Sequence, residues 1–462
     1  MTATPNVIRE PAREIPVRGE YDVVVLGGGP AGIAAAAAAG ALGRRTLLVE
    51  RYGFLGGMGT AAGVTNFCGL HANVHGEVRQ VVRGVADELL ARLARLDGLN
   101  APHAIFGRTM AQAYDTAAYK CAADELLLGR GVTLLFHAFA CGVVKERDGI
   151  DALVIETKSG RAAMRGKIFI DCSGDGDLAA LAGAPYEVGD GAGNMLYPTM
   201  MFRLAGVDPA RAGEAWRTVP ALMEAAERAG RAKFPRKGGV IRPMAHPTEW
   251  RVNFTQVKSA NGRALNGADA DELSAGEIEG RRQAVAFFEF LKREAPGFAE
   301  AYIVDMPPQL GIRETRRIAS LYQLTGDDVL SCASFADTIG VNGWPIEAHV
   351  AGDVVWRWPE PGSRGFNHLP YRMLVPPGLR NLLVAGRCAG MSHEGQSAAR
   401  VSGGCFVMGE AAGSAAHLAL AGDGAVADID IGALQRLLER GGAWLGRADA
   451  ALPTPVFEMS GS

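Results

Sequence analysis

The residues Tyr21-Asp-Val-Val-Val-Leu-Gly-Gly-Gly-Pro-Ala-Gly32 form a short apolar run, typical of a β-strand, that ends in a glycine-rich turn. An alanine-rich segment follows the turn and predicts a helix. Gly27, Gly29 and Gly32 have the spacing G-x-G-x-x-G. The first glycine permits a tight turn, the second lets backbone N–H groups approach a pyrophosphate, and the third allows close packing of helix on strand. The pattern predicts a dinucleotide-binding βαβ unit.

A second apolar run, Thr46-Leu-Leu-Val-Glu50, follows at the distance expected for the next strand of such a unit. Glu50 closes this run, where a carboxylate accepts hydrogen bonds from a ribose. The glycine spacing alone is weak evidence, because ordinary turns also contain it. Its place between a strand and a helix, with the acid in position, makes the dinucleotide interpretation much more specific.

Bulk composition excludes several classes of protein. The chain has 462 residues, of which 48% are hydrophobic and 21% charged, as in a folded protein with room for two domains. Its net charge of −3 and lack of a basic block predict no nucleic-acid partner. Residues 23–42 are uncharged but rich in Ala and Gly, so we expect no membrane span. The first twenty residues lack the apolar core of a signal peptide.

The cysteines also bear on location and metal binding. There are seven, scattered and without a C-x-x-C pair, which fits a reducing cytoplasm. Cys68, His71 and His75 form C-x-x-H-x-x-x-H, but no fourth zinc ligand lies nearby in the sequence. We therefore predict no metal site and expect His71 to face a substrate cavity or to anchor its loop.

Apolar periodicity suggests the remaining elements. Helices are expected at about 76–97 and 109–130, a long charged helix at 275–294, and a helix rich in small residues at 398–420. Strands are expected at 132–136, near 150–157, at 167–171 and at 381–386. The tail after about 445 has little pattern.

Three separated glycine-rich sites favour FAD over NAD as the dinucleotide. They lie at 27–32, 56–59 and 386–404, and an extended FAD needs contributions from both ends of the chain. A further glycine pattern at 174–179 could suggest NAD(P)H. There, however, Asp175 and Asp177 would repel a pyrophosphate, and no second complete βαβ unit exists.

The motifs at 22–32, 50–60, 170–179, 311–318 and 381–413 together resemble a family of FAD-dependent oxidoreductases. This family is related to the fumarate reductase and succinate dehydrogenase flavoproteins, the thiazole synthases and the flavin subunit of heterodisulfide reductase. The nearest likeness is to its broad bacterial branch.

The resemblance implies which residues contact FAD. In many related flavoproteins the strand at 381–386 would end in Gly-Asp, whereas here Gly386 is followed by Arg387, which would reach a phosphate or the substrate instead. The implied FAD contacts are Gly27, Gly29, Pro30, Ala31, Gly32, Glu50, Arg51, Gly57, Met58, Thr60, Asp175, Gly386, Arg387, Gly403 and Gly404.

The expected fold class is α/β, with a Rossmann-like FAD-binding domain (a parallel sheet with helices) and an inserted α+β substrate domain. Residues 20–185 would form the first part of the FAD-binding domain and 186–370 the inserted domain. Residues 371–425 would complete the FAD-binding domain, and 426–462 would form a C-terminal helix and tail.

Three residues are candidates for chemistry. His393 is expected to move the proton that accompanies hydride transfer, or else to be a structural histidine. Arg313 would share a helix face with Arg317 and contact substrate or flavin; the alternative is a solvated face paired with Glu314. Arg400 would bind a substrate carboxylate, or pair with Glu410 or the flavin phosphate.

These observations predict an FAD-dependent oxidoreductase, a dehydrogenase or reductase, that transfers a hydride between a small organic substrate and flavin N5. The arginines suggest that this substrate is anionic. Two alternatives remain at this point: an electron-transfer flavin subunit that works with an iron–sulfur partner, and an NAD(P)H-dependent flavin monooxygenase. An electron-acceptor protein and a second copy of the chain are further partners that the sequence leaves open.

Overall fold

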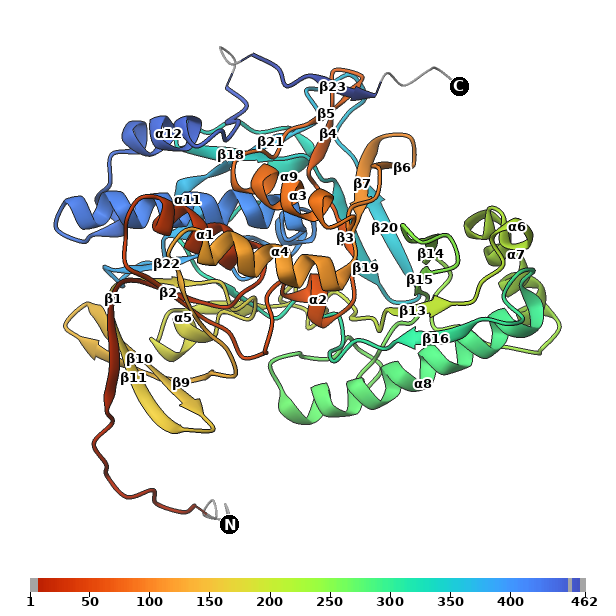
Figure 1. The fold of residues 1–462 in the computed structure, drawn as a ribbon, viewed down its shortest axis with the longest axis horizontal. Coiled ribbons are helices and arrows are strands. Elements are labelled where there is room, and N and C mark those ends of the chain that lie inside the picture. Colours follow the sequence, from red (N-terminus) through yellow and green to blue (C-terminus); the bar gives the residue numbers. More distant parts are fainter. Residues whose placement is uncertain (1–6, 448–450, 458–462) are drawn as a thin grey trace.

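The computed structural model describes residues 7–447 and 451–457 (Figure 1). Its main sheet has seven strands in the order β8-β2-β1-β11-β10-β9, with β22 also paired to β11. The strands β8, β2, β1, β11 and β22 run parallel, while β9 and β10 extend the sheet as an antiparallel hairpin. Their bounds are β1 Val17–Leu26, β2 Thr46–Val49, β8 Thr133–Leu135, β9 Phe139–Glu146, β10 Gly149–Thr157, β11 Gly160–Asp171 and β22 Leu382–Val384.

Two helices from opposite ends of the chain lie side by side on this sheet. They are α1 (Pro30–Ala41) and α11 (Ser402–Ala421), and both are rich in Ala and Gly (Figure 1). A Cβ added to Gly409 would lie 2.0 Å from the Ala31 carbonyl oxygen, so the two backbones are in direct contact. Small residues therefore join the first nucleotide-binding helix to the C-terminal part of the domain. The fold class is α/β, with a Rossmann-like dinucleotide-binding unit.

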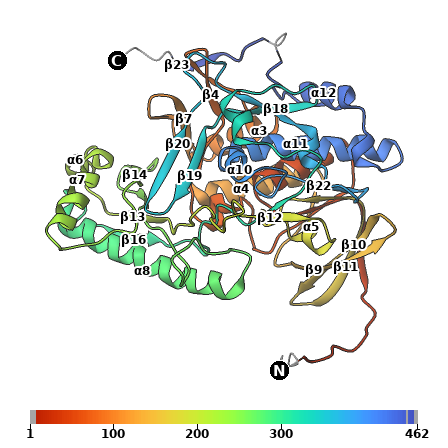
Figure 2. The same ribbon diagram turned by 180° about the vertical axis from the view of Figure 1, so that it is seen from behind.

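A second sheet belongs to an inserted α+β unit, which projects from one end of the molecule in both views (Figures 1 and 2). Its four antiparallel strands follow the order β14-β15-β13-β16. Its core combines aliphatic and aromatic side chains, including a stacked pair of Phe254 and Phe287 with ring centroids 4.6 Å apart. The bounds are β13 Phe202–Ala205, α6 Pro209–Ala212, α7 Ala215–Arg228, β14 Val240–Pro243, β15 Trp250–Asn253, α8 Ala270–Glu294 and β16 Tyr302–Asp305.

The hydrophobic cores show which segments of the chain pack into which unit. One core draws on residues between Met200 and Ile312. Residues from Ile318 to Val375, by contrast, pack into the core of the Rossmann-like unit. The domain limits at 185, 370 and 425 stay predictions, and residues 448–450 and 458–462 of the predicted tail lie outside the described residues.

Three expected helices have different boundaries in the structure. The segment 76–97 begins with the strand β5 (Glu77–Gln80) before α3 (Val85–Arg95), and 109–130 begins with β7 (Thr109–Ala113) before α4 (Thr116–Leu128). In the second case Asp115 caps α4, because its carboxylate accepts hydrogen bonds from the N–H groups of Ala117 and Ala118. The segment 398–420 is divided between α10 (His393–Ala399) and α11.

The expectation that Arg313 and Arg317 share a helix face is wrong, because residues 312–318 are not helical. This segment is extended and ends in β17 (Arg316–Ile318), which pairs with β12 (Tyr186–Val188). Its polar side chains have partners in distant segments, and Ile318 N–H donates to the Cys388 carbonyl. These tertiary hydrogen bonds replace the local ones that a helix would provide. Arg313 and Arg317 therefore do not share a helix face.

The remaining elements are short and connect these units. In the part of the chain that the structure describes, no helix combines the length and apolarity needed to cross a membrane. The bounds are α2 Met58–Ala61, β3 Asn66–Phe67, β4 His71–Val74, β6 His103–Ile105, α5 Asp177–Leu181, α9 Gly326–Leu330, β18 Thr338–Asn342, β19 Ile346–Val350, β20 Asp353–Arg357, β21 Asn367–Pro370, α12 Ile431–Arg440 and β23 Pro455–Phe457, with 3₁₀ turns at Tyr371–Leu374 and Val426–Asp428.

Candidate functional site

The first glycine turn has a geometry that only glycine satisfies. Gly27 has φ +98°, and a Cβ there would lie 2.4 Å from the Cys172 carbonyl oxygen. A Cβ on Gly32 would lie 1.8 Å from the Gly27 carbonyl oxygen. Gly29 and Pro30 begin α1, and no side chain caps this helix end. The turn therefore presents bare backbone at a helix N-terminus, the arrangement that binds phosphate groups.

The second glycine segment lies directly opposite this turn. Gly57 has φ +55°, and a Cβ on it would lie 2.7 Å from the Gly29 Cα. Gly56 N–H donates to the Gly28 carbonyl at 2.8 Å, which joins the two loops. Thr60 fixes the second loop by donating from its hydroxyl to the Leu55 carbonyl at 2.7 Å. The two loops thus form one narrow strip of closely apposed backbone, which we call the glycine strip.

Glu50 closes one side of this strip. Its buried carboxylate accepts hydrogen bonds from Gly28 N–H at 2.7 Å and Tyr52 N–H at 2.9 Å. Arg51 points the other way, with its guanidinium 3.9 Å from Asp175 and 3.1 Å from the Gln309 amide oxygen. The carboxylate is thus fixed at the carboxyl end of β2, where a dinucleotide ribose is bound in Rossmann-like folds.

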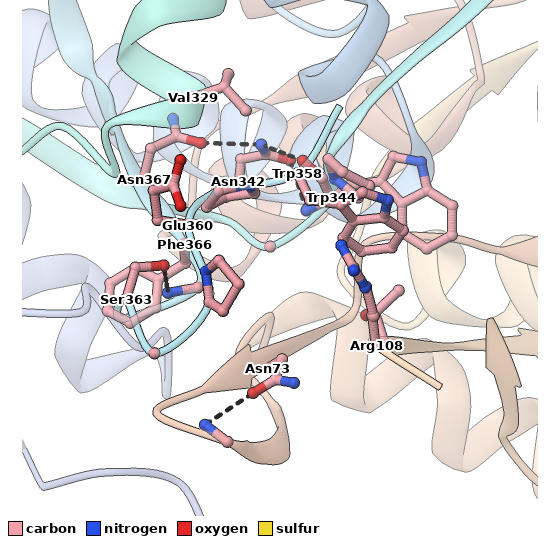
Figure 3. Close-up of a pocket in the computed structure, with 18 residues that line it drawn as sticks. Asn73, Arg108, Val329, Asn342, Trp344, Trp358, Glu360, Ser363, Phe366 and Asn367 are labelled. Carbon is pink, nitrogen blue, oxygen red and sulfur yellow. Dashed lines mark hydrogen bonds between the residues drawn. The ribbon is translucent and has the colours of Figure 1, made fainter. Parts of the chain in front are cut away.

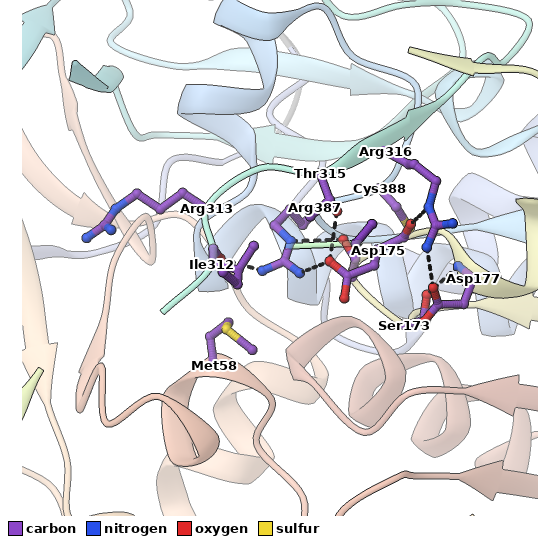
Figure 4. A network of polar contacts seen from close by, with 12 residues as sticks. Met58, Ser173, Asp175, Asp177, Ile312, Arg313, Thr315, Arg316, Arg387 and Cys388 are labelled. Carbon is purple, nitrogen blue, oxygen red and sulfur yellow. Dashed lines mark hydrogen bonds and ion pairs between the residues drawn. The ribbon is translucent and has the colours of Figure 1, made fainter. Parts of the chain in front are cut away.

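Asp175 and Arg387 form a buried ion pair beside these loops, with 2.6 Å between Oδ1 and Nη2 (Figure 4). Arg387 also donates to the carbonyls of Gly174, at 2.8 Å, and of Ile312. Thr315 donates its hydroxyl to the same carboxylate at 2.7 Å. Because its donors are engaged by the protein, Arg387 holds three segments together in this structure. Its predicted contact with FAD stays a prediction.

The C-terminal glycines complete the strip. Gly386 has φ +90°, and a Cβ there would lie 3.0 Å from the Cβ of Ala31. Gly403 lies against the Gly69 carbonyl, which a Cβ would approach to 2.1 Å. A Cβ on Gly404 would lie 2.3 Å from the Ala399 carbonyl oxygen. The Gly386 contact brings the C-terminal part of the chain against α1, whereas the contacts of Gly403 and Gly404 allow close packing around the start of α11.

One face of α10 carries the polar residues His393, Gln396 and Arg400, at the spacing i, i+3, i+7. The Gln396 amide donates to the Arg313 carbonyl at 2.8 Å, so this face lies along the extended segment 312–318. The structure thus brings together the three residues that the sequence predicted for chemistry, although Arg313 is not in a helix.

His393 is oriented by a buried carboxylate. Its Nδ1 lies 2.9 Å from Oε2 of Glu314, whose side chain is fully buried. Glu314 also accepts a hydrogen bond from Leu196 N–H at 2.9 Å and pairs with Arg317. The carboxylate accepts the Nδ1 proton of His393, which leaves Nε2 of the ring as a proton acceptor.

Arg313 and Arg400 both lack a carboxylate partner among the described residues. Arg313 donates to the Tyr197 carbonyl at 2.9 Å and the Thr199 hydroxyl at 3.0 Å, which are neutral acceptors. In Arg400, Nε and Nη2 are buried without a hydrogen-bond partner in the described part of the chain. Burial lowers the pKa of both guanidinium groups. The alternative pairing of Arg400 with Glu410 does not form, because Glu410 binds the N-terminus of α3.

The C-x-x-H-x-x-x-H segment spans β4 and the turns on either side of it. Within the described residues, no group of three His, Cys, Asp or Glu side chains is arranged to hold a metal ion. Cys68 accepts a hydrogen bond from the Asn66 amide, and burial raises its pKa to about 12. His71 is buried, and its carbonyl accepts the Thr109 hydroxyl at 3.0 Å, so the backbone of this loop is anchored.

The family model for FAD dependent oxidoreductases matches residues 22–438. The chain belongs to this family. FAD is therefore its cofactor, and the glycine strip described above suits an extended dinucleotide. No curated protein matches the chain at a significant level.

Solved structures that resemble this FAD-dependent oxidoreductase have low sequence identity to it. A geranylgeranyl bacteriochlorophyll reductase-like protein of Thermoplasma acidophilum is 13% identical, with 92% of this chain and 82% of that chain covered and a TM-score of 0.44. The p-nitrophenol 4-monooxygenase of Pseudomonas putida is 13% identical, with 93% and 90% covered and a TM-score of 0.46. A myxobacterial chondrochloren halogenase is 14% identical, with 92% and 78% covered and a TM-score of 0.46. The predicted kinship with fumarate reductase and thiazole synthases stays a prediction.

The sequence did not identify three further residues beside Arg313 and Arg400. Arg236 follows α7, and Glu347 and His349 lie on β19. Nε2 of His349 is 3.0 Å from Glu347 Oε1, and its Nδ1 is 3.4 Å from Arg236 Nη1. The i, i+2 spacing of Glu347 and His349 places both on one face of a strand, which was the only available signal.

His349 and Glu347 differ in protonation state. Burial, followed by the nearby charge of Arg313, lowers the pKa of His349 well below its ordinary value. Burial alone would raise the pKa of Glu347, but hydrogen bonds from His349 and Trp344 and the positive charge of Arg400 lower this pKa to about 2. Glu347 is therefore a carboxylate, and His349 is neutral.

Trp344 joins this cluster to a pocket of about 200 Å³ (Figure 3). Its indole N–H donates to Glu347 at 2.9 Å, while Trp344 and Trp358 contribute aromatic surface to the pocket. The Arg108 guanidinium lies 5.4 Å from the centre of the Trp358 ring. None of the predicted cofactor or catalytic residues lines this pocket.

Proposed function

We propose that the chain oxidises or reduces a small organic anion by hydride transfer to or from FAD. FAD, when bound, supplies N5 of its ring as the hydride acceptor or donor. The turn at 27–32 would hold the diphosphate at the N-terminus of α1, and Glu50 would accept hydrogen bonds from a ribose. The backbone of Gly57, Met58, Gly386, Gly403 and Gly404 would line the rest of the cofactor.

One observation supports an anionic substrate above all. Arg313 and Arg400 are electrostatic neighbours, yet neither has an ion pair with a carboxylate in the described structure. Buried charges in proteins are normally paired. A guanidinium with unused donors also matches the geometry of a carboxylate or phosphate. These two arginines would bind the substrate and fix the carbon that exchanges the hydride.

His393 would handle the accompanying proton. Glu314 holds its Nδ1 at 2.9 Å, and this contact fixes the ring orientation and stabilises the protonated form once the ring has taken up a proton. Nε2 would accept the proton from an oxidised substrate or return it during reduction. Its position at the start of α10, one turn before Gln396, places it on the same helix face as Arg400.

The test is anaerobic mixing of the purified holoenzyme with a panel of small organic acids, phosphate esters and neutral alcohols. We expect an anion in this panel to bleach the visible flavin absorbance in a stopped-flow instrument. The variant His393→Gln should slow this bleaching about 10²-fold or more, because the proton acceptor is lost. The exposed His246 provides a matched control, and His246→Gln should bleach at the normal rate.

Other outcomes would contradict the proposal. Near-normal bleaching by His393→Gln would exclude the proton role. Oxygen-dependent consumption of NAD(P)H with hydroxylated product would favour the monooxygenase alternative. Bleaching that requires an iron–sulfur protein would favour the electron-transfer alternative.

A further inference from the structure

The charge of the cluster around Glu347 and His349 is unbalanced. Three guanidinium groups, those of Arg236, Arg313 and Arg400, interact electrostatically with it. Among the described residues none of the three has an ion pair with a carboxylate, whereas the buried Arg317 pairs with a glutamate.

Arg236 carries the strongest evidence of an absent partner. It is only 3% exposed, and its Nε has no hydrogen-bond partner in the described part of the chain. One terminal nitrogen donates to the Asn253 carbonyl at 2.6 Å, and the other faces Nδ1 of His349 at 3.4 Å. Both acceptors are neutral, so the positive charge of Arg236 is not compensated by them.

The histidine does not change this balance. Because Arg236 is a donor only, Nδ1 of His349 must accept, and its Nε2–H then donates to Glu347. His349 is therefore uncharged and orients Arg236. Among the described residues, Glu347 supplies the negative charge inside the cluster, and its two oxygens already accept from His349 and Trp344. Asp353 also attracts Arg236 but is exposed, and Glu314 also attracts Arg400 but is paired with Arg317. Within the cluster, as far as the described residues go, three positive charges therefore face one negative charge, an excess of two.

We infer that this cluster binds a substrate with two negative charges, and that Arg236 is the residue of the inserted unit that selects such dianions. A singly charged ligand would leave one buried guanidinium uncompensated, which is costly at low dielectric constant. A dicarboxylate and a phosphate ester share the required chemistry. The inference rests on the proposed function, since it names the substrate class of the same site.

Ligand binding to the oxidised holoenzyme, measured without turnover, tests how many negative charges the cluster requires of its ligand. Pentanoate, glutarate and inorganic phosphate are titrated at constant pH and ionic strength, and binding is followed by calorimetry and by the flavin spectrum. We expect glutarate or phosphate to bind at least about tenfold more tightly than pentanoate. A preference for glutarate indicates a dicarboxylate, and one for phosphate indicates a phosphate ester. Equal affinity for all three would overturn the inference.

Substitutions of Arg236 then test whether this residue selects dianions. Arg236→Gln should abolish the preference for the dianion, and Arg236→Lys, which keeps the charge but loses the planar fork, should weaken it by a smaller factor. Arg228→Gln, an exposed site on α7, should leave it unchanged. If Arg236→Gln does not fold, as judged by circular dichroism and FAD content, Arg236→Lys decides. An undiminished preference in a folded Arg236 variant would overturn the assignment.

The two proposals fail in different ways. A holoenzyme that binds dianions through Arg236 but is bleached by no organic anion contradicts hydride transfer and supports the dianion site. A holoenzyme bleached by singly charged anions, without a preference for dianions, does the reverse.

Discussion

At the scale of single residues, the hydrogen-bond partners of each arginine distinguish a structural role from a role in binding or chemistry. Arg387 lies in a motif that the sequence assigned to FAD or substrate, but its donors bind Asp175 and two carbonyls. Arg236 lies in no motif, yet it has an unused buried donor. The sequence contains the residue type, whereas the partner depends on the folded structure. Charged motifs alone therefore could not distinguish the two roles.

Glu410 gives a residue-scale prediction about stability. It lies on α11, and its carboxylate accepts Val85 N–H at 3.1 Å, at the N-terminus of α3. Burial raises its pKa from an ordinary 4.5 to about 8. Between pH 4.5 and about pH 8, Glu410 is therefore protonated in the folded protein and ionised in the unfolded chain. Its contribution to stability should thus be complete below about pH 4.5 and be lost as the pH rises through about 8.

Urea unfolding at several pH values measures this effect. The free energy of unfolding of the wild type should lose up to about 1.4 kcal/mol per pH unit from this group across that range. Glu410→Gln should remove this slope, and the exposed Glu224→Gln should retain it. Equal slopes for Glu410→Gln and the wild type would show that the carboxyl group titrates normally.

At the scale of elements, local patterns were reliable where contacts are local. The strand, turn and helix over residues 17–41 agree with the prediction, because the glycine spacing and the alanine run specify them within a short segment. The segment 312–318 was misassigned because its partners lie on β12 and after β22. The strands of the inserted sheet have only four residues each, too few for a clear alternation.

The contact between Gly29 and Gly57 gives an element-scale prediction. A methyl group on Gly57 would lie 2.7 Å from the Gly29 Cα, so Gly57→Ala should force the two loops apart. We expect the affinity for FAD to fall by about tenfold or more, as measured by fluorescence titration of the apoprotein. Gly43 is a matched control, because it also has a positive φ (+74°) but no atom within 4 Å of an added Cβ.

Gly43→Ala should therefore destabilise the fold by about 1 kcal/mol through backbone strain and leave FAD affinity unchanged. Wild-type affinity in Gly57→Ala would show that the two loops do not form one binding strip. Parallel loss of affinity in both variants would trace the effect to backbone strain alone.

At the scale of the whole molecule, the site depends on segments that are distant in the chain. The glycine strip joins the loops near residues 29 and 57 to α11, and the arginine cluster joins the inserted unit to α10. The sequence predicted the first set because its motifs have recognisable spacing. It missed Arg236, Glu347 and His349 because only tertiary packing brings them to Arg313. The residues of the FAD-binding unit were thus easier to predict from the sequence than those of the arginine cluster.

The most direct test of this interpretation is to identify the cofactor that the purified chain carries. The protein is denatured, and the released small molecules are separated by chromatography and quantified against the protein. We predict a yellow protein that releases FAD in an amount close to that of the chain. A colourless protein that takes up no added FAD would contradict the central claim.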